Sequence, residues 1–312
     1  MTDIVTLTMN PAVDVSTSAE RVVSEHKLRC SLPSRDPGGG GINVARVATR
    51  LGADVKALYP RGGETGALLR RLIDAEGIAS LAVHVAGETR EDITVYEEIS
   101  GEQFRFVFPG PELSDVEWGE CLGAISSLKG SPAYFVASGS LPPGVPDDFY
   151  ARAASAAKAC GAKVIVDTSG PALGAALEEG VFLIKPNLRE LRQMTGETLD
   201  DQDSRIAAAR RLVEAGRTEI VALSLGHDGA LFVTAEAAWR APALDVKLVS
   251  AVGAGDSFVG GLTWSLASGH DLQEAFRYAL AAGSAALLTP GTGLSLAEDI
   301  HCLHPEVDLQ RL

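Results

Sequence analysis

Short, nearly continuous runs of Val, Ile, Leu and Ala alternate along this chain with longer segments in which apolar residues recur at helical spacing. Because strands without polar alternation are buried on both faces, this pattern predicts an α/β fold with a mainly parallel sheet between helices. The strands are expected at Ile4–Met9, Val55–Tyr59, Ala133–Ala137, Lys163–Val166, Phe182–Ile184 and Glu219–Ser224. The helices are expected at Ile42–Leu51, Gly66–Glu76, Asp115–Leu128, Asp147–Cys160, Leu188–Thr195, Asp203–Ala215, Gly255–Ala267 and Leu272–Thr289.

Two segments, roughly residues 12–34 and 89–109, interrupt this alternation. In both, apolar and polar residues alternate one by one, as in Ile93-Thr94-Val95-Tyr96-Glu97. That pattern is typical of antiparallel strands with one exposed face. The favoured interpretation is a small β lid over the main domain, or a dimer surface; the alternative is an extension of the main sheet. The length suits either two ordinary domains or one large α/β domain, and no internal repeat or low-complexity linker divides the chain; residues 1–312 are expected to form a single domain.

The charge of the chain restricts its partners. The formal net charge of −14 disfavours binding to nucleic acid, and an anionic substrate would need local Arg and Lys side chains to overcome that field. The four cysteines form no CxxC pair, which fits a reducing compartment. The first residues, Met1-Thr2-Asp3-Ile4, do not begin a leader pattern, and no apolar run reaches the ~18 residues that span a bilayer. A cytoplasmic location without a membrane partner is therefore expected.

The strongest motif is Gly253-Ala254-Gly255-Asp256, which opens a predicted helix. The amide groups of such a turn and the positive end of the helix can hold the oxygens of a phosphoryl group during transfer. A carboxylate in the first helical turn can accept the proton of an attacking hydroxyl group. The alternative is that Asp256 only complements the helix dipole.

A second glycine-rich segment, Gly38-Gly39-Gly40-Gly41, leads into the helix that carries Asn43. Missing side chains let a ligand approach the main chain, and the Asn43 amide can bond hydroxyl groups, so a substrate cradle is predicted rather than a flexible turn. The loop that begins at Ser138 follows a predicted strand, and ligands of open α/β sheets bind at that edge.

Two further groups of polar residues are candidates for the site. In Lys185-Pro186-Asn187-Leu188-Arg189-Glu190, the Asn and the Glu could form a helix capping box, or Glu190 could organise Mg²⁺; the sequence does not separate these interpretations. Four cations, at positions 27, 29, 90 and 105, fall in the two lid segments. Their grouping indicates a phosphate clamp, whereas any single Arg is more often a solvated surface residue.

Taken together, these segments resemble the PfkB (ribokinase-like) carbohydrate kinases over nearly the whole chain. The similar segments are Asn10-Pro11-Ala12-Val13-Asp14, Gly38–Asn43, Ser138–Gly144, Lys185–Glu190, Ser224-Leu225-Gly226 and Val252–Ser257, the last of which matches the GAGD signature of the family. Within the family, Lys27-Leu28-Arg29-Cys30, residues 101–107 and the four glycines look most similar to the minor bacterial 6-phosphofructokinases. The branch of 1-phosphofructokinases and tagatose-6-phosphate kinases shares many of these features.

The resemblance implies a ribokinase-like αβα sandwich, with a β lid that also forms a homodimer. It implies that Asp256 is the catalytic base, at a turn made by Gly253, Ala254 and Gly255. The residues implied to hold the sugar are Asp14, Gly39, Asn43 and Ser138, and those implied to receive its phosphate are Lys27, Arg90 and Arg105.

The same resemblance assigns residues to ATP and to two kinds of cation. The implied ATP contacts are Lys185, Asn187, Ser224, Gly226, Gly229 and Ser284. Glu190 is implied to organise Mg²⁺, and Ser250, Val252, Ala286 and Gly291 to form a K⁺ loop. Two positions depart from the family pattern, since Thr289 replaces an Asn and Gly293 replaces an Arg.

The expected activity is ATP-dependent phosphorylation of fructose 6-phosphate at its 1-hydroxyl, which gives fructose 1,6-bisphosphate and ADP. The alternatives on the same fold are a tagatose-6-phosphate kinase, a 1-phosphofructokinase and a nucleoside kinase. An alternative of another class is a sugar-phosphate sensor that binds without transfer, but the intact motif Gly253–Asp256 argues against it.

Overall fold

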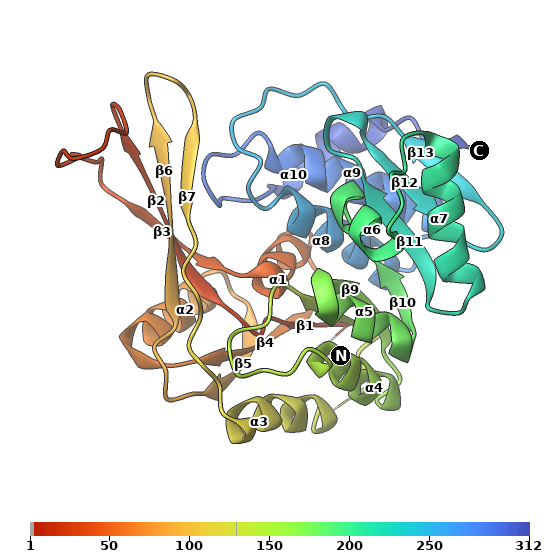
Figure 1. The fold of residues 1–312 in the computed structure, drawn as a ribbon, viewed down its shortest axis with the longest axis horizontal. Coiled ribbons are helices and arrows are strands. Elements are labelled where there is room, and N and C mark those ends of the chain that lie inside the picture. The colour runs from red at the N-terminus through yellow and green to blue at the C-terminus, as the bar shows by residue number, and fades with distance from the viewer. Residues whose placement is uncertain (1–2, 129) are drawn as a thin grey trace.

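The computed structural model describes residues 3–128 and 130–312; Met1 and Thr2, part of the segment expected to contain no leader, lie outside it. Over these residues the chain forms a ten-stranded sheet and a separate four-stranded sheet (Figure 1). From edge to edge the large sheet consists of β14 (Gln310–Arg311), β13 (Ala238–Ala241), β12 (Ala230–Val233), β11 (Thr218–Ser224), β10 (Val181–Ile184), β9 (Lys163–Asp167), β8 (Tyr134–Ser138), β1 (Ile4–Leu7), β4 (Val55–Arg61) and β5 (Ala79–His84). The strands from β11 to β5 are parallel, and β12 to β14 continue the sheet in antiparallel pairs.

Helices cover both faces of the large sheet, as Figure 1 shows. Apolar residues of the strands contribute to both layers; in β1, Ile4 packs into one layer, whereas Val5 and Leu7 pack into the other. The first layer contains α1 (Gly40–Arg50), α2 (Gly63–Ala75), α8 (Ala254–Ala267), α9 (Leu272–Ala286) and α10 (Ala297–Leu303). The second contains α3 (Asp115–Ser126), α4 (Phe149–Ala159), α5 (Gly170–Glu179), α6 (Leu188–Thr195) and α7 (Gln202–Glu214). The predicted αβα sandwich is confirmed.

The sequence pattern did not predict several shorter elements. β13 contains Arg240, and β5 is a partly exposed edge strand, so neither has the apolar run of a central strand. β12 is a run of four buried apolar residues, as long as β10, and sequence reasoning overlooked it. The helix α5 begins with Gly170-Pro171, a pair that marks a turn in sequence but here starts a helix, where proline needs no amide hydrogen. Along the described chain, no helix is long and apolar enough to cross a membrane.

The two irregular segments form a separate sheet, as predicted, rather than an extension of the main one. Its strand order is β3 (Ser34–Gly38), β2 (Ala12–Ala19), β6 (Arg90–Glu97) and β7 (Gln103–Phe106). The first lid segment extends further than residue 34, because β3 pairs with β2 up to Gly38. Between β2 and β3 the expected strand is interrupted by turns, and Glu25 there has a positive φ of 62°.

Candidate active site

The candidate residues meet where the carboxyl ends of the parallel strands lie side by side. The chain passes outward from β1 to β4 and β5 and then returns to place β8 on the other side of β1. Such a reversal of strand order opens a crevice, where ligands of α/β sheets bind. Ser138 ends β8, Asp167 ends the neighbouring β9, and Lys185 follows β10, so all three side chains start at this edge.

The predicted glycine turn begins the helix α8. Gly253 is the N-cap residue in the left-handed conformation, with a φ of 76°, and its carbonyl accepts a hydrogen bond of 2.8 Å from the amide of Ser257. Asp256 lies in the first turn of the helix, next to the amide groups that have no partner within the helix. A side chain at Gly255 would place its Cβ 3.4 Å from Nζ of Lys185, so the ammonium group lies directly beside this turn.

The Asp256 side chain is partly buried, and its surroundings change its basicity. Burial, reinforced by the charge of Asp167, raises the pKa of Asp256 to about 6, although Asn43, Lys185 and Arg105 act to lower it. Nδ2 of Asn43 donates a hydrogen bond of 2.8 Å to Oδ2 of Asp256. A carboxylate whose pKa is close to neutral can both accept and release a proton at physiological pH, as a general base requires.

The side-chain oxygen of Asn43 is an acceptor without a hydrogen-bond partner in the described part of the chain. The amide nitrogen of Asn43 bonds to Asp256, but its buried Oδ1 has no hydrogen-bond partner in residues 3–128 and 130–312. Because a buried acceptor without a partner costs free energy, such an atom is suited to a ligand donor. A hydroxyl group bonded there would lie next to the Asp256 carboxylate.

The ends of two neighbouring strands, β9 and β10, carry an ion pair of which the sequence predicted only one member. Nζ of Lys185 lies 3.2 Å from Oδ1 of Asp167; the Lys185 side chain is buried, and that of Asp167 is 14% exposed. Burial acts to lower the pKa of Lys185, but Asp167 and Glu190 outweigh it, so the pKa is raised and the ammonium charge is kept. Sequence reasoning named Lys185 and missed Asp167, although Asp167 directly follows the apolar run Val164–Val166 that ends at this edge.

Three carboxylates and Ser138 line a cavity of about 220 Å³ at this edge; the acids are Asp167, Glu190 and Asp256. Glu190 also forms the capping box that the sequence offered as its alternative role. Its Oε2 accepts a bond of 2.9 Å from the amide of Asn187, whose Oδ1 accepts one of 2.9 Å from the amide of Glu190. The two interpretations are therefore compatible, since the same carboxylate caps α6 and borders the cavity.

The four-glycine segment is explained partly by the protein itself. A side chain at Gly38 would overlap the carboxyl group of Asp14, and one at Gly40 would overlap Oγ of Ser138. Gly39 has a φ of 109°, which other residues rarely adopt. These glycines therefore let α1 begin in contact with β2 and β8, and they bring Asp14 and Ser138 close to the start of the helix.

Asp14 projects from the lid strand β2 toward the same crevice. Burial, reinforced by the nearby carboxylate of Asp92, raises the pKa of Asp14 to about 7; Arg46 and Arg105 act to lower it. Asp256 also contributes to this pKa, which places the two acids within electrostatic reach. The lid thus contributes a carboxyl group that is protonated for part of the time at neutral pH.

The four lid cations occupy different settings. Arg90 is held in place, because Nη1 donates to the carbonyl of Phe108 at 2.8 Å, Nη2 donates to that of Asn10 at 3.1 Å, and Asp92 lies 3.3 Å away. Arg105 is exposed on β7 opposite Thr94, which shares a face of β6 with Asp92. The remaining two, Lys27 and Arg29, lie exposed in the loop between β2 and β3.

The residues implied to contact ATP gather around a second cavity, of about 750 Å³, on the other side of the glycine turn. Gly255 lines it together with five of them: Asn187, Ser224, Gly226, Gly229 and Ser284. The sixth, Lys185, lies beside Gly255. Sequence reasoning missed the apolar wall of this cavity, which includes Leu248, Phe258, Leu280 and Leu287.

The residues implied to form a K⁺ loop lie close together. Oγ of Ser250 donates to the carbonyl of Gly291 at 3.1 Å and accepts a bond of 3.2 Å from the amide of Val252. The two departures from the family pattern contact each other, because a side chain at Gly293 would overlap Cγ2 of Thr289. The missing side chain at 293 and the threonine at 289 therefore fit as a pair.

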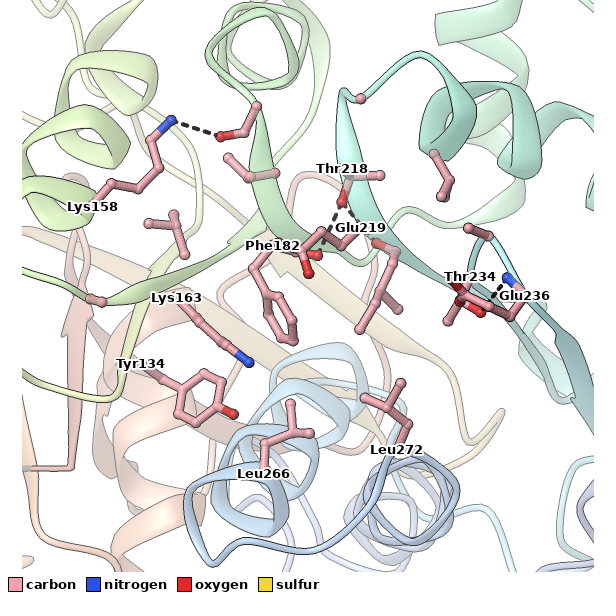
Figure 2. A pocket seen from close by; sticks show the side chains of 18 of the residues that line it. Tyr134, Lys158, Lys163, Phe182, Thr218, Glu219, Thr234, Glu236, Leu266 and Leu272 are labelled. Carbon is pink, nitrogen blue, oxygen red and sulfur yellow. Dashed lines mark hydrogen bonds between the residues drawn. The ribbon is translucent and has the colours of Figure 1, made fainter.

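A larger groove, of about 940 Å³, lies at the opposite edge of the sheet, along the first residues of β8 to β11 (Figure 2). Its charged groups are largely occupied with the protein. Nζ of Lys163 lies 4.6 Å from the centre of the Phe182 ring, and Lys158 pairs with Glu179 at 2.6 Å. None of the site residues predicted from the sequence lines this groove.

Comparisons with known proteins agree with this geometry. The pfkB family carbohydrate kinase model matches residues 4–299. The ATP-dependent 6-phosphofructokinase isozyme 2 of Mycobacterium tuberculosis is 44% identical over 95% of this chain and 87% of its own length, and that of Escherichia coli is 42% identical over 96% and 97%. The crystal structure of Escherichia coli phosphofructokinase-2 in complex with substrates and products superposes with a TM-score of 0.93 at 40% identity, covering 97% of this chain and 99% of that one. The chain therefore belongs to the pfkB family of carbohydrate kinases.

Proposed function

We propose that this protein transfers the γ-phosphoryl group of ATP to the 1-hydroxyl of fructose 6-phosphate. The observation that carries the proposal is the position of Asp256, which borders the carboxylate cavity while its own glycine turn borders the cavity of the ATP residues. A base at that point lies between the two substrates that a kinase must bring together. Bacterial relatives that are 42% and 44% identical are ATP-dependent 6-phosphofructokinases, which supports the substrate assignment.

In this proposal the proton of the sugar 1-hydroxyl passes to the Asp256 carboxylate as the oxygen attacks. Asn43 fixes the orientation of that carboxylate by its bond of 2.8 Å and offers its free Oδ1 to the sugar. The amide groups of Ala254 and Gly255 at the start of α8 would stabilise charge on the transferring phosphoryl oxygens. The ammonium group of Lys185 beside Gly255 would add a positive charge at the same place.

The residues present fit Mg²⁺ that is shared with the substrate. Across the described chain, no three His, Cys, Asp or Glu side chains are arranged to hold a metal ion by themselves. Mg²⁺ commonly binds through one or two carboxylates while substrate phosphates and water complete its shell. Glu190 and Asp167 border the cavity and would supply such carboxylates; bound Mg²⁺ would neutralise charge on the phosphates.

The loop around Ser250 would hold K⁺ chiefly through backbone oxygens. Carbonyl groups replace the hydration shell of K⁺ in protein sites, and they do not depend on side-chain identity. Ser250, Val252, Ala286 and Gly291 belong to adjoining segments, linked by the bond from Ser250 to the Gly291 carbonyl. A structure of Escherichia coli phosphofructokinase-2 in complex with potassium, with a TM-score of 0.94, supports this assignment.

The sugar phosphate would bind beneath the lid, where Arg105 faces the site. Asp14 pairs with Asp92 across the lid sheet, and Arg105 pairs with Thr94, two residues further along β6. Side chains two residues apart share one face of a strand, so Arg105 lies on the face of Asp14. Arg90 borders the same region but bonds to the backbone of Phe108 and Asn10, so it also holds the lid together.

Arg105→Ala is expected to raise the KM for fructose 6-phosphate by about tenfold to a hundredfold, because a charge-assisted contact to phosphate is lost. The KM for ATP should change by less than about twofold, because the lost contact contributes to binding of the sugar and not of the nucleotide. Steady-state kinetics with each substrate varied in turn provides the measurement. Arg152→Ala is the control, because Arg152 is an exposed arginine of α4 that pairs with Asp148 outside the lid. Equal effects on both KM values would contradict the assignment of Arg105 to the phosphate site.

A second copy of this chain would cover the apolar side of the lid. Leu32 is 96% exposed, and Ile99, Phe106, Val107 and Phe108 are between 48% and 65% exposed. Phe106 pairs with Ile93 on the face of the lid opposite Arg105, and several exposed large apolar side chains in one small sheet are typical of an interaction surface. Sedimentation velocity is expected to show a dimer that Phe106→Asp converts to monomers; a wild-type monomer at micromolar concentration would overturn this assignment.

A substrate panel tests the proposed function. With ATP and Mg²⁺, in the presence and absence of K⁺, kcat/KM is measured for fructose 6-phosphate, tagatose 6-phosphate and fructose 1-phosphate. Fructose 6-phosphate is expected to give the highest value, and a value tenfold below either rival would refute the substrate assignment. ADP release that requires both sugar and Mg²⁺ is expected of a kinase and is not expected of a sugar-phosphate sensor.

A further inference from the structure

The loop of residues 291–295 contacts the catalytic turn through one buried side chain. Leu294 is 1% exposed, and it occupies the space beside Gly253: a side chain at Gly253 would overlap Cδ2 of Leu294. Leu294 also has a φ of 59°, a left-handed conformation that is unfavourable for leucine. A residue is held in such a conformation only where its surroundings determine it strongly.

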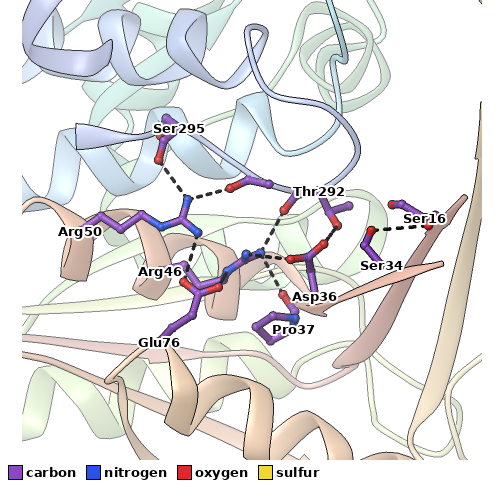
Figure 3. Close-up of polar contacts among 10 residues, drawn as sticks. Ser16, Ser34, Asp36, Pro37, Arg46, Arg50, Glu76, Thr292 and Ser295 are labelled. Atoms are coloured by element: carbon purple, nitrogen blue, oxygen red, sulfur yellow. Dashed lines mark hydrogen bonds and ion pairs between the residues drawn. The ribbon is translucent and has the colours of Figure 1, made fainter. Parts of the chain in front are cut away.

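Two arginines of α1 hold the backbone on both sides of Leu294 (Figure 3). Nη1 of Arg50 donates to the carbonyl of Gly293 at 2.7 Å and to that of Ser295 at 3.1 Å. Nη1 of Arg46 donates to the carbonyl of Thr292 at 3.1 Å. Three carbonyl groups around Leu294 are thus bound by fixed, charged donors, which explains how the loop keeps the unfavourable conformation.

The arginines are themselves fixed by carboxylates from other elements. Glu76, at the end of α2, accepts from Nε of Arg46 at 2.6 Å and from Nη2 of Arg50 at 3.2 Å. Asp36 of the lid strand β3 accepts from Oγ1 of Thr292 at 3.2 Å. Arg46 is fully buried, so this network forms in a medium where charged hydrogen bonds are strong. The loop that carries Leu294 is therefore linked to α1, α2 and the lid.

We propose that Leu294, locked by Arg46 and Arg50, is a positioning residue for phosphoryl transfer. Its side chain packs against Gly253. This contact fixes the direction of the first amide groups of α8 and of the Asp256 carboxylate. This inference rests on the proposed kinase function, because the positions of these groups matter only if a phosphoryl group is transferred there. The competing view is that Leu294 only fills the core, in which case its loss lowers stability without changing kcat.

Leu294→Gly separates these two views. Glycine adopts the left-handed conformation without strain, so the backbone of the loop is preserved while the supporting side chain is removed. The expected result is a fall in kcat of about tenfold to a hundredfold, with the KM values for ATP and sugar within about twofold of wild type. Leu294→Met restores most of the volume and is expected to restore most of kcat.

Leu69→Ala is the matched control, because Leu69 is a fully buried leucine of α2 in the same apolar layer. It should lower the unfolding temperature and leave kcat unchanged. If Leu294→Gly lowers the unfolding temperature in the same way but retains wild-type kcat, the positioning role is refuted. A wild-type protein without sugar-dependent ADP release would instead refute the proposed function.

Arg50→Lys provides a second test if Leu294→Gly fails to fold. Arg50 is 24% exposed, and lysine keeps the positive charge but lacks the fork that binds the two carbonyl groups through Nη1 and Glu76 through Nη2 at the same time. A kcat reduction of about threefold to tenfold is expected, with unchanged KM values. Where Leu294→Gly does fold, the two effects should not multiply in the double variant, because both act through the same loop. Independent effects, or no effect of Arg50→Lys on kcat, would contradict the proposal.

Discussion

Asp256→Asn is expected to lower kcat by about a hundredfold to ten-thousandfold, the usual contribution of a general base. Asparagine has the same shape and can still accept the hydrogen bond that Asn43 donates at 2.8 Å, but its amide cannot take the proton of the sugar hydroxyl. The KM for ATP should remain close to that of wild type, since the nucleotide cavity is formed by other side chains. Sugar-dependent ADP release at saturating substrates measures this effect.

A matched control separates the base from a simple helix-dipole effect. Asp203 also lies in the first turn of a helix, α7, but it is exposed and far from the glycine turn in the chain. Asp203→Asn removes the same charge from the first turn of a helix and is expected to leave kcat unchanged. If Asp256→Asn turned over at a nearly normal rate, Asp256 would only complement the dipole of α8, and the base assignment would be lost.

Gly253→Ala is expected to lower kcat by about a hundredfold to a thousandfold, as when a donor of an oxyanion hole is lost. Two obstacles act together at this position. The φ of 76° disfavours any residue with a side chain, and the added methyl group would overlap Cδ2 of Leu294. The turn must therefore rotate, and its amide groups would no longer face the phosphoryl oxygens. The free energy of unfolding should also fall by about 1–3 kcal/mol, the range for overpacking.

Gly269→Ala tests whether backbone strain alone explains that loss. Gly269 follows the other end of α8 and has a similar φ of 82°, but a side chain there would meet no atom within 4 Å. Denaturant unfolding is expected to show a loss of about 1 kcal/mol, and kcat should be unchanged. A wild-type kcat for Gly253→Ala would show that the turn does not position the transferred group.

The sequence predicts the glycine turn and the lid because both depend on local patterns. Four residues, Gly253–Asp256, are enough to predict a helix start with an adjacent carboxylate, and alternating residues are enough to predict exposed strands. The partnership of Asp167 with Lys185 depends instead on the parallel pairing of β9 with β10, which sets two strand ends side by side. No pattern within either segment contains that register.

The surroundings of glycines and the positions of positive φ angles likewise cannot be predicted from local sequence patterns. The sequence pattern predicts that Gly38 and Gly40 leave space for a ligand. In the structure, the side chains of Asp14 and Ser138 fill part of that space. Leu294 adopts the left-handed conformation without being glycine, so composition gives no sign of it. Its conformation follows from hydrogen bonds to arginines about 245 residues earlier, such as Arg50 to Ser295.

The pH dependence of kcat tests the role of Asp256 most directly. The carboxylate must be deprotonated to accept a proton, and burial raises its pKa to about 6. With saturating sugar, so that the titration of Asp14 affects binding less, kcat should be constant above neutrality and fall about tenfold per pH unit below the pKa that Asp256 has in the substrate complex. The residual activity of Asp256→Asn should lack this acid limb. A wild-type kcat that stays constant down to about pH 4.5, or an acid limb that persists in Asp256→Asn, would contradict the assignment of Asp256 as the base.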